Sequence, residues 1–225
     1  MNNNQMLSTT LLLTLVAGYC DTVTFLAADE LFSAHVTGNF IVFAYHLVQD
    51  ASTANWSKLL SFPVFIVAVA TGRWVANTFS GRYAILGVAG ALLLASGALV
   101  LGLQYTGAFT AAGKQWAAMI VVFAMGLQNA FGRLFSKETY GPTTVMTGNV
   151  AQVTLDIAAR LTGPAGNAAK GVAISIQLLV IGSFLFGCLS GALAARHFGL
   201  WPVALAGLIL LMLSARKSAA VPVTD

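Results

Sequence analysis

The sequence predicts an all-α membrane protein: a polytopic helix bundle of about six spans with two short interrupted half-helices. Two observations predict this class. Of 225 residues, 58% are hydrophobic and only 8% are charged, whereas soluble domains carry roughly 25% charged residues. Apolar runs recur along the whole chain, each close to the roughly 20 residues that cross a bilayer. We therefore expect residues 1–225 to form a single membrane domain without a soluble appendage.

The spans are expected where apolar residues run without interruption. No Lys or Arg precedes the first run, which argues against a cleaved signal peptide, so we expect this span to stay in the mature protein. The third run is rich in Gly and Ala, and such small residues let helix backbones approach closely. The expected spans are residues 9–28, 59–79, 83–103, 116–135, 171–193 and 197–214.

Two shorter and more polar segments, residues 31–48 and 143–159, lie between the long runs. They are too short and too polar to be assigned as spans by hydropathy alone. Both contain the same tripeptide, which makes them the most informative part of the sequence. The tripeptides are Thr37, Gly38 and Asn39 in the first segment and Thr147, Gly148 and Asn149 in the second.

The surroundings of the two tripeptides also repeat. Each tripeptide follows a long run that holds a glycine and a polar pair, with 19 residues from Gly18 to Thr37 and 21 residues from Gly126 to Thr147. This order predicts an internal duplication. The copies are expected at about residues 9–103 and 116–214, and two pairs of small residues, Gly72 with Ala76 and Gly187 with Gly191, are a further candidate match.

The Lys and Arg residues near the span ends favour a topology in which the short segments do not cross. If all eight segments cross, the basic residues divide six to five and give no orientation. If the short segments enter and return on the same side, they divide eight to three, the kind of excess found on the cytoplasmic side. We therefore expect six spans with both termini cytoplasmic, and three spans per copy would invert the second copy, as in many transporters. The eight are Arg73, Arg82, Arg133, Lys137, Arg160, Lys170, Arg216 and Lys217, and the three are Lys58, Lys114 and Arg196.

Each tripeptide is expected to begin a half-helix, at residues 39–48 and 149–159. Threonine is a good N-cap, and glycine permits close backbone approach. The first amide groups of a helix have no intrahelical partner, and the helix dipole adds positive potential there. Two opposed starts would form a small polar site suited to a carboxylate or another electron-rich group. The alternative is that the Thr and Asn side chains only bond neighbouring helices and hold the bundle together.

Asp21 is the leading single candidate for a binding residue. It lies about 12 residues into the first span, near mid-depth, where a charge is costly and usually marks a pathway or a paired site. The alternative is a protonated carboxyl group that bonds a neighbouring helix. Its counterpart in the second copy is Asn129, with Gln128 beside it, so both copies are polar at this position but only the first is charged. His35 precedes the first tripeptide by two residues and is either a titrating group beside the site or an interfacial residue.

Four sequence blocks carry a resemblance to a known family. They are Gly-Tyr-Cys-Asp-Thr-Val-Thr-Phe-Leu from Gly18, His-Val-Thr-Gly-Asn from His35, Gly-Leu-Gln-Asn-Ala from Gly126 and Thr-Gly-Asn from Thr147. In this order they resemble the YoaK-like family of uncharacterised bacterial inner-membrane proteins, over nearly the whole chain. The resemblance implies a bacterial cytoplasmic-membrane protein of about six spans and brings no substrate or activity.

The expected function is that of a transporter or channel-like protein for a small polar or anionic solute, and the alternative is a non-transporting packing or partner protein. We expect no enzyme, metal or cofactor, because the chain has no zinc-ligand cluster, no Ser/His/Asp set at plausible depth and no repeated carboxylates. Its basic residues form no stripe, which argues against nucleic acid as a partner. Membrane lipid is the expected surrounding, and the glycine-rich spans leave surface for a homodimer. The expected solute-binding residues are Asp21, His35, Thr37, Gly38, Asn39, Gln128, Asn129, Thr147, Gly148 and Asn149.

Overall fold

The chain folds into a bundle of helices. The computed structural model describes residues 3–49, 56–79, 81–162 and 168–218, and within these ranges the regular structure is helical throughout. This confirms the expected all-α class. The elements are α1 (Asn3–Ala27), α2 (Gly38–Gln49), α3 (Ser57–Thr78), α4 (Ala84–Tyr105), α5 (Ala111–Leu134), the 3₁₀ helix η2 (Ser136–Glu138), α6 (Thr147–Thr162), α7 (Ala168–Phe198) and α8 (Val203–Ser218).

Most of the helices match the length of a bilayer crossing. Among the described helices, α1, α3, α4, α5 and α7 are long and apolar enough to span by length and composition. Helix α8 is apolar but has only 16 residues, which is about 24 Å against a hydrocarbon core of about 30 Å. The chain is therefore a helical membrane protein whose last helix is short for a span.

The expected start of the last span, at residue 197, is wrong. Helix α7 continues for 31 residues to Phe198. The chain then turns at Gly199, whose φ of 70° lies in the region that glycine adopts without strain. Pro202 directly precedes the first residue of α8, Val203, where its missing N–H is not needed. The turn residues lie among apolar ones, so hydropathy alone does not reveal the break.

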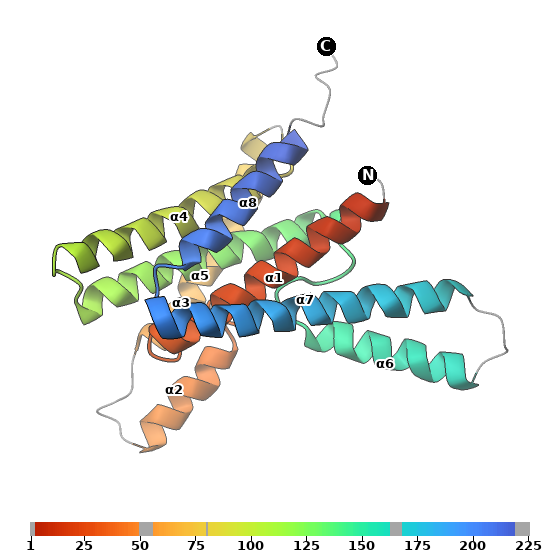
Figure 1. The fold of residues 1–225 in the computed structure, drawn as a ribbon, viewed down its shortest axis with the longest axis horizontal. Helices are drawn as coiled ribbons and strands as arrows, with labels where there is room; N and C mark the ends of the chain where they lie inside the picture. Colours follow the sequence, from red (N-terminus) through yellow and green to blue (C-terminus); the bar gives the residue numbers. More distant parts are fainter. Residues whose placement is uncertain (1–2, 50–55, 80, 163–167, 219–225) are drawn as a thin grey trace, which may run out of the picture.

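Helices α1 and α5 form the centre of the bundle. Their apolar stretches are 61% and 67% buried, whereas those of α3 and α7 are 22% and 11% buried and face outward. Helix α7 packs along α1, α3 packs along α5, and α4 lies against both α5 and α8 (Figure 1). These contacts are close because the facing residues are small: a Cβ added at Gly126 would lie 2.6 Å from the Ala68 Cβ of α3.

The segments that precede α2 and α6 return into the bundle. Helix α1 ends at Ala27, yet the backbone amides of Ala34 and His35 bond to Asp21, six residues or about 9 Å back along α1. In the second half, Asn129 of α5 bonds to Thr144, which lies beyond the end of α5. Figure 1 shows that α2 and α6 both start near the middle of the long helices and run apart in opposite directions.

The bundle has two distinct ends, which we call the Asp29 end and the Glu138 end. At the Asp29 end, the Asp29 carbonyl accepts from Lys58 at the start of α3, and its carboxylate pairs with Lys114 of α5 at 2.6 Å. Helix α3 starts at the end of the bundle where α1 stops. The chain between them, which contains α2, therefore enters the bundle and returns to the same end without crossing the membrane.

The Glu138 end holds the start of α4 and the end of α5. The Glu138 carboxylate pairs with Arg82 and accepts from the Tyr83 hydroxyl at 2.7 Å. Burial, with the Glu138 carboxylate adding to it, raises the pKa of Tyr83 well above its usual range, so the phenol stays a donor. The described start of α1 and end of α8 also lie at this end (Figure 1).

Candidate functional site

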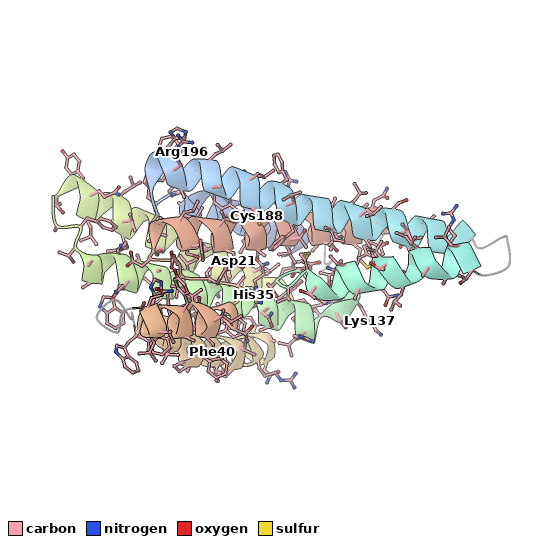
Figure 2. The ribbon with its side chains drawn as sticks, turned by 90° about the horizontal axis from the view of Figure 1, so that it is seen from below. Asp21, His35, Phe40, Lys137, Cys188 and Arg196 are labelled. Carbon is pink, nitrogen blue, oxygen red and sulfur yellow. The ribbon has the colours of Figure 1, made fainter. Side chains whose placement is uncertain are left out.

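The Asp21 carboxylate binds the loop that precedes α2. One carboxylate oxygen accepts from the Ala34 amide at 2.5 Å, from the Ser33 hydroxyl at 3.4 Å and from the His35 amide at 3.3 Å. The other accepts from the His35 amide at 3.2 Å. The loop amides have no helix or strand to supply acceptors, and Asp21, which is 5% exposed, supplies them. Figure 2 shows Asp21 and His35 next to each other at the start of α2.

Each tripeptide asparagine closes its own loop. Asn39 accepts from the Phe32 amide and donates to the Phe32 carbonyl, both at 2.8 Å, and it also donates to the Ser61 hydroxyl of α3 at 2.9 Å. Asn149 donates to the Pro142 carbonyl at 2.9 Å. Both contacts span seven residues. The second loop has one bond fewer because proline has no N–H to donate.

The starts of the two half-helices differ in how they are covered. At α2, the amides of Gly38 and Asn39 donate to the carbonyls of His35 and Val36 at 2.9 and 3.1 Å. The Phe32 ring covers this start, since a Cβ added at Gly38 would lie 3.0 Å from it. The start of α2 is therefore closed by its own loop.

The start of α6 is open. The first amide of α6 that donates to a loop carbonyl in the described chain is that of Val150, to Met146 at 3.0 Å. The preceding amides of Gly148 and Asn149 have no such bond within the described residues. A Cβ added at Gly148 would meet no atom within 4 Å. The α6 start thus has unpaired amides beside free space.

That free space is a cavity of about 660 Å³ between α6 and α7. Gln177 of α7 contributes a side-chain oxygen, Oε1, that is shielded from solvent and has no hydrogen-bond partner among the described residues. The wall therefore offers amide donors on α6 and one unpaired acceptor on α7. It consists of Tyr140, Gly141, Pro142, Gly148, Asn149, Gln152, Val172, Ala173, Ile176 and Gln177.

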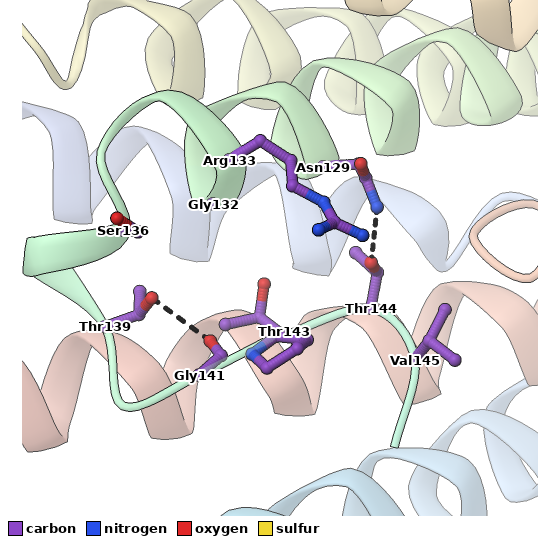
Figure 3. A pocket seen from close by; sticks show the side chains of 10 residues that line it. Asn129, Gly132, Arg133, Ser136, Thr139, Gly141, Thr143, Thr144 and Val145 are labelled. Carbon is purple, nitrogen blue, oxygen red and sulfur yellow. Dashed lines mark hydrogen bonds between the residues drawn. The ribbon is translucent and has the colours of Figure 1, made fainter. Parts of the chain in front are cut away.

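A second cavity, of about 290 Å³, lies between the end of α5 and the loop before α6 (Figure 3). It shares Gly141 and Pro142 with the first cavity. Figure 3 shows the Arg133 guanidinium beside the hydrogen-bonded pair of Asn129 and Thr144. The wall consists of Asn129, Gly132, Arg133, Ser136, Thr139, Gly141, Pro142, Thr143, Thr144 and Val145.

The expected binding residues fall into two groups, one around each half-helix start. Gln128 belongs to neither: it is fully buried, its amide donates to the Leu13 carbonyl of α1 at 2.8 Å, and its Oε1 has no partner in the described part. The first group lies around the loop before α2, and the walls of both cavities come from the second half alone. The first group is Asp21, His35, Thr37, Gly38 and Asn39, and the second is Asn129, Thr147, Gly148 and Asn149.

Several polar residues that line the cavities were not among the expected binding residues, including Arg133, Thr143, Thr144 and Gln177. Arg133 entered only the count of basic residues near the span ends. Thr143 and Thr144 precede the second tripeptide by four and three residues, and Ser33 and Ala34 occupy the same places before the first. Comparing these flanking positions would have drawn attention to the threonines, whereas nothing in the sequence marks Gln177.

Comparisons with known proteins place the chain in a family. No curated protein and no solved structure matches it. Residues 9–215 match the family model described as "Protein of unknown function (DUF1275)", an uncharacterised family, as the resemblance of the sequence implied. Because the match covers nearly all of the sequence, the chain belongs to the DUF1275 family.

Proposed function

We propose that the protein is a transporter or channel-like protein of the bacterial inner membrane for a small polar or anionic solute. The observation that carries the proposal is the open start of α6. Unpaired helix amides beside a cavity of about 660 Å³ are a costly arrangement in a membrane protein unless a solute or water uses them. The unpaired Oε1 of Gln177 on the opposite wall adds an acceptor for a donor group of that solute.

The lining of the two cavities supports transport rather than catalysis. Among the described residues, no His, Cys, Asp or Glu contributes to either wall, so the commonest general bases and metal ligands are not at hand to activate the Ser and Thr hydroxyls there. Amide, hydroxyl and guanidinium groups remain, and these groups bind a solute without changing it.

An inverted duplication is part of the proposal, and three pairs of contacts support it. Asp21 and Asn129 form hydrogen bonds with the loops before α2 and α6. Asn39 and Asn149 each bond a residue of those loops that lies seven positions earlier in the chain. Helix α1 packs on α7 as α5 packs on α3. Opposed half-helices between inverted copies are a recurring transporter architecture.

The orientation with cytoplasmic termini follows from the positions of basic residues. In the six-span arrangement, the Glu138 end collects eight Lys and Arg residues and the Asp29 end three. Cytoplasmic loops carry this kind of excess. The exposed apolar faces of α3 and α7 are then covered by lipid, or in part by a second copy of the chain.

A packing or partner protein remains the second candidate, because one observation favours it. The Asp21 carboxylate and the Asn39 amide already bind groups of their own chain. Under this reading the polar residues that bond their own chain serve folding, so Asp21→Asn would impair folding or assembly and no solute would be found.

Uptake into proteoliposomes tests the proposal. A mixture of small carboxylates and uncharged polar solutes is offered to vesicles with and without the purified protein, and the contents are identified by mass spectrometry. Gly148→Leu fills the cavity, and Gly182→Leu is the matched control, since both glycines are exposed, helical and have no atom within 4 Å of an added Cβ.

The expected result is uptake of at least one solute that Gly148→Leu reduces at least about tenfold and Gly182→Leu leaves unchanged. Both variants replace a helical glycine by a better helix former, so neither is expected to lose stability. Uptake that neither variant alters, or no uptake by a well-folded protein, would contradict the proposal.

A further inference from the structure

The cavity beside Arg133 contains an unpaired positive charge. Arg133 lies in the last turn of α5, and none of the ion pairs between described residues involves it. Glu138, the acidic residue closest in sequence, is already bound by Arg82 and Tyr83. The guanidinium therefore faces a cavity of about 290 Å³ without an anionic partner among the described residues.

Two threonine hydroxyls add donors to the same cavity. Thr144 accepts from the Asn129 amide at 2.7 Å through its hydroxyl oxygen, which leaves its O–H proton available to donate. Thr143 also lines the cavity, and its hydroxyl makes no hydrogen bond within the described residues. Both threonines are 3% exposed. Neither hydroxyl is among the shielded atoms of the described residues that lack a partner, so the Thr143 hydroxyl opens to the cavity, where an oxygen of a bound anion would accept its proton.

The first half of the chain shows what occupies the corresponding place. There the Asp21 carboxylate sits against Ser33 and the amides of Ala34 and His35. The loop of the first half thus binds a carboxylate that its own helix supplies.

In the second half the residue at the place of Asp21 is the neutral Asn129, and an arginine lies four residues further along the helix. Its counterpart in the first half is Phe25, whose ring stacks on Phe32 at 4.8 Å between centroids. The rings of Phe25 and Phe32 fill the space at the loop before α2. At the corresponding positions, Arg133 and Pro142 leave a cavity at the loop before α6. Compared with the loop before α2, the loop before α6 also has hydroxyl donors, has a cation beside it and has no carboxylate.

We propose that the Arg133 cavity binds a small oxyanion, a carboxylate or phosphate group, beside Asn129, the neutral counterpart of Asp21. Arg133 supplies the charge and a planar pair of donors, and Thr143 and Thr144 donate their hydroxyl protons. The oxyanion belongs either to a free solute or to the headgroup of an anionic lipid. The step from binding to transport rests on the proposed function, whereas the binding itself does not.

The test uses the purified full-length chain and two variants with a matched control. Arg133→Gln removes the charge, and Asn129→Asp supplies an internal carboxylate at the place corresponding to Asp21. Arg196→Gln is the control, because Arg196 is likewise an exposed arginine in the last turn of a helix. Sodium acetate and sodium phosphate are titrated against sodium chloride at constant ionic strength, and binding is followed by calorimetry and by the shift in melting temperature.

The expected result is saturable binding of acetate or phosphate to the wild type and to Arg196→Gln, weakened at least about tenfold in Arg133→Gln and in Asn129→Asp. Asn129→Asp is expected to fold as well as the wild type, since its carboxylate pairs with Arg133, so the test does not depend on the folding of Arg133→Gln alone. Equal binding by the wild type and both variants would overturn the proposal.

A lipid arm separates the two sources of the oxyanion. The protein is reconstituted in nanodiscs that contain phosphatidylglycerol and phosphatidylcholine, and the lipids retained after mild detergent extraction are quantified. Retention of phosphatidylglycerol that Arg133→Gln abolishes, without binding of acetate or phosphate, identifies a headgroup site and upholds the oxyanion proposal. Binding of free anions without any uptake into vesicles upholds it too and refutes only the transport function. If the protein shows no anion binding and no selective lipid retention, the proposed site itself is refuted.

Discussion

Replacing Asn39 by alanine removes three hydrogen bonds from the interior of the bundle. The Phe32 amide and carbonyl lose their bonds of 2.8 Å, and the Ser61 hydroxyl loses one of 2.9 Å. The same replacement at Asn149 removes one bond to an oxygen, the Pro142 carbonyl at 2.9 Å, and one weak bond to the Met146 sulfur at 3.5 Å. The two variants thus change the same tripeptide position in the two halves but remove different numbers of bonds.

The expected magnitudes follow from that difference. A buried hydrogen bond contributes about 0.6 kcal/mol in measurements on membrane helices and up to about 1.5 kcal/mol in soluble proteins. Asn39→Ala is therefore expected to lower the free energy of unfolding by about 2 to 4.5 kcal/mol, and Asn149→Ala by about 0.6 to 1.5 kcal/mol. The first loss is large compared with typical single substitutions.

The assay is equilibrium unfolding of the purified protein in mixed micelles, with increasing denaturing detergent and circular dichroism as the signal. Thr37→Ala and Thr147→Ala are the controls, because both side chains are exposed and make no hydrogen bond within the described residues; each is expected to change stability by less than about 0.5 kcal/mol. Equal losses of stability for Asn39→Ala and Asn149→Ala, or a larger loss for Asn149→Ala, would refute the reasoning. The number of hydrogen bonds to the loop would then not determine the loss in the free energy of unfolding.

Gly126→Leu is expected to prevent α3 and α5 from packing, since a Cβ there already overlaps α3, whereas Gly102→Leu, which meets no atom within 4 Å, is expected to be neutral. Gel filtration in detergent separates the two outcomes, and an unchanged profile for Gly126→Leu would contradict the packing described. Glu138→Gln is expected to lower stability by about 1 to 3 kcal/mol, because the carboxylate is 6% exposed and accepts from Tyr83. Asp29→Asn, whose side chain is 45% exposed, is expected to cost less than about 1 kcal/mol, and unfolding of both variants in mixed micelles measures the difference.

Hydropathy and charge were enough to predict most of the fold. Apolar runs place five spans within a few residues of α1, α3, α4, α5 and α7, because a bilayer fixes both length and composition. The count of basic residues favoured the arrangement in which α2 and α6 return, and for α2 the contacts of Asp29 with the starts of α3 and α5 support it. The start of α8 was missed because Gly199 and Pro202 interrupt a run that stays apolar.

The alignment of small residues shows where sequence comparison stops being sufficient. The pairs matched by spacing were Gly72 with Ala76 and Gly187 with Gly191. In the structure, a Cβ added at Gly72 would lie 2.5 Å from the Ala130 Cβ of α5 and 3.7 Å from Leu127, whereas Cβ atoms added at Gly187 and at Gly191 would both approach Tyr19 of α1. Tyr19 and Leu127 directly follow the matched glycines Gly18 and Gly126. The register of the two pairs therefore depends on the partner helix, and spacing along the sequence does not determine it.

The binding candidates were harder to predict for the same reason. A tripeptide identifies a helix start, but whether that start is open depends on what the preceding loop places over it. Phe32 covers the start of α2, whereas no atom lies within 4 Å of a Cβ added at Gly148 in α6. The two starts have identical tripeptides and different accessibility.

The two halves differ in their residue types, so the difference between them does not depend on a conformational change. Phe25 and Phe32 close the first loop by stacking, and a movement of helices would not turn them into the arginine and proline of the second loop. A carrier that exposes its site alternately through equivalent halves would need two loops that can both open. With one loop sealed by aromatic rings and by the Asp21 carboxylate, access to a bound solute is expected from the second half, through the cavity between α6 and α7 that Gly148 lines. A bulky residue at Gly148 should therefore block solute entry, whereas enlarging the first loop by Phe32→Ala should destabilise the fold without opening a second route.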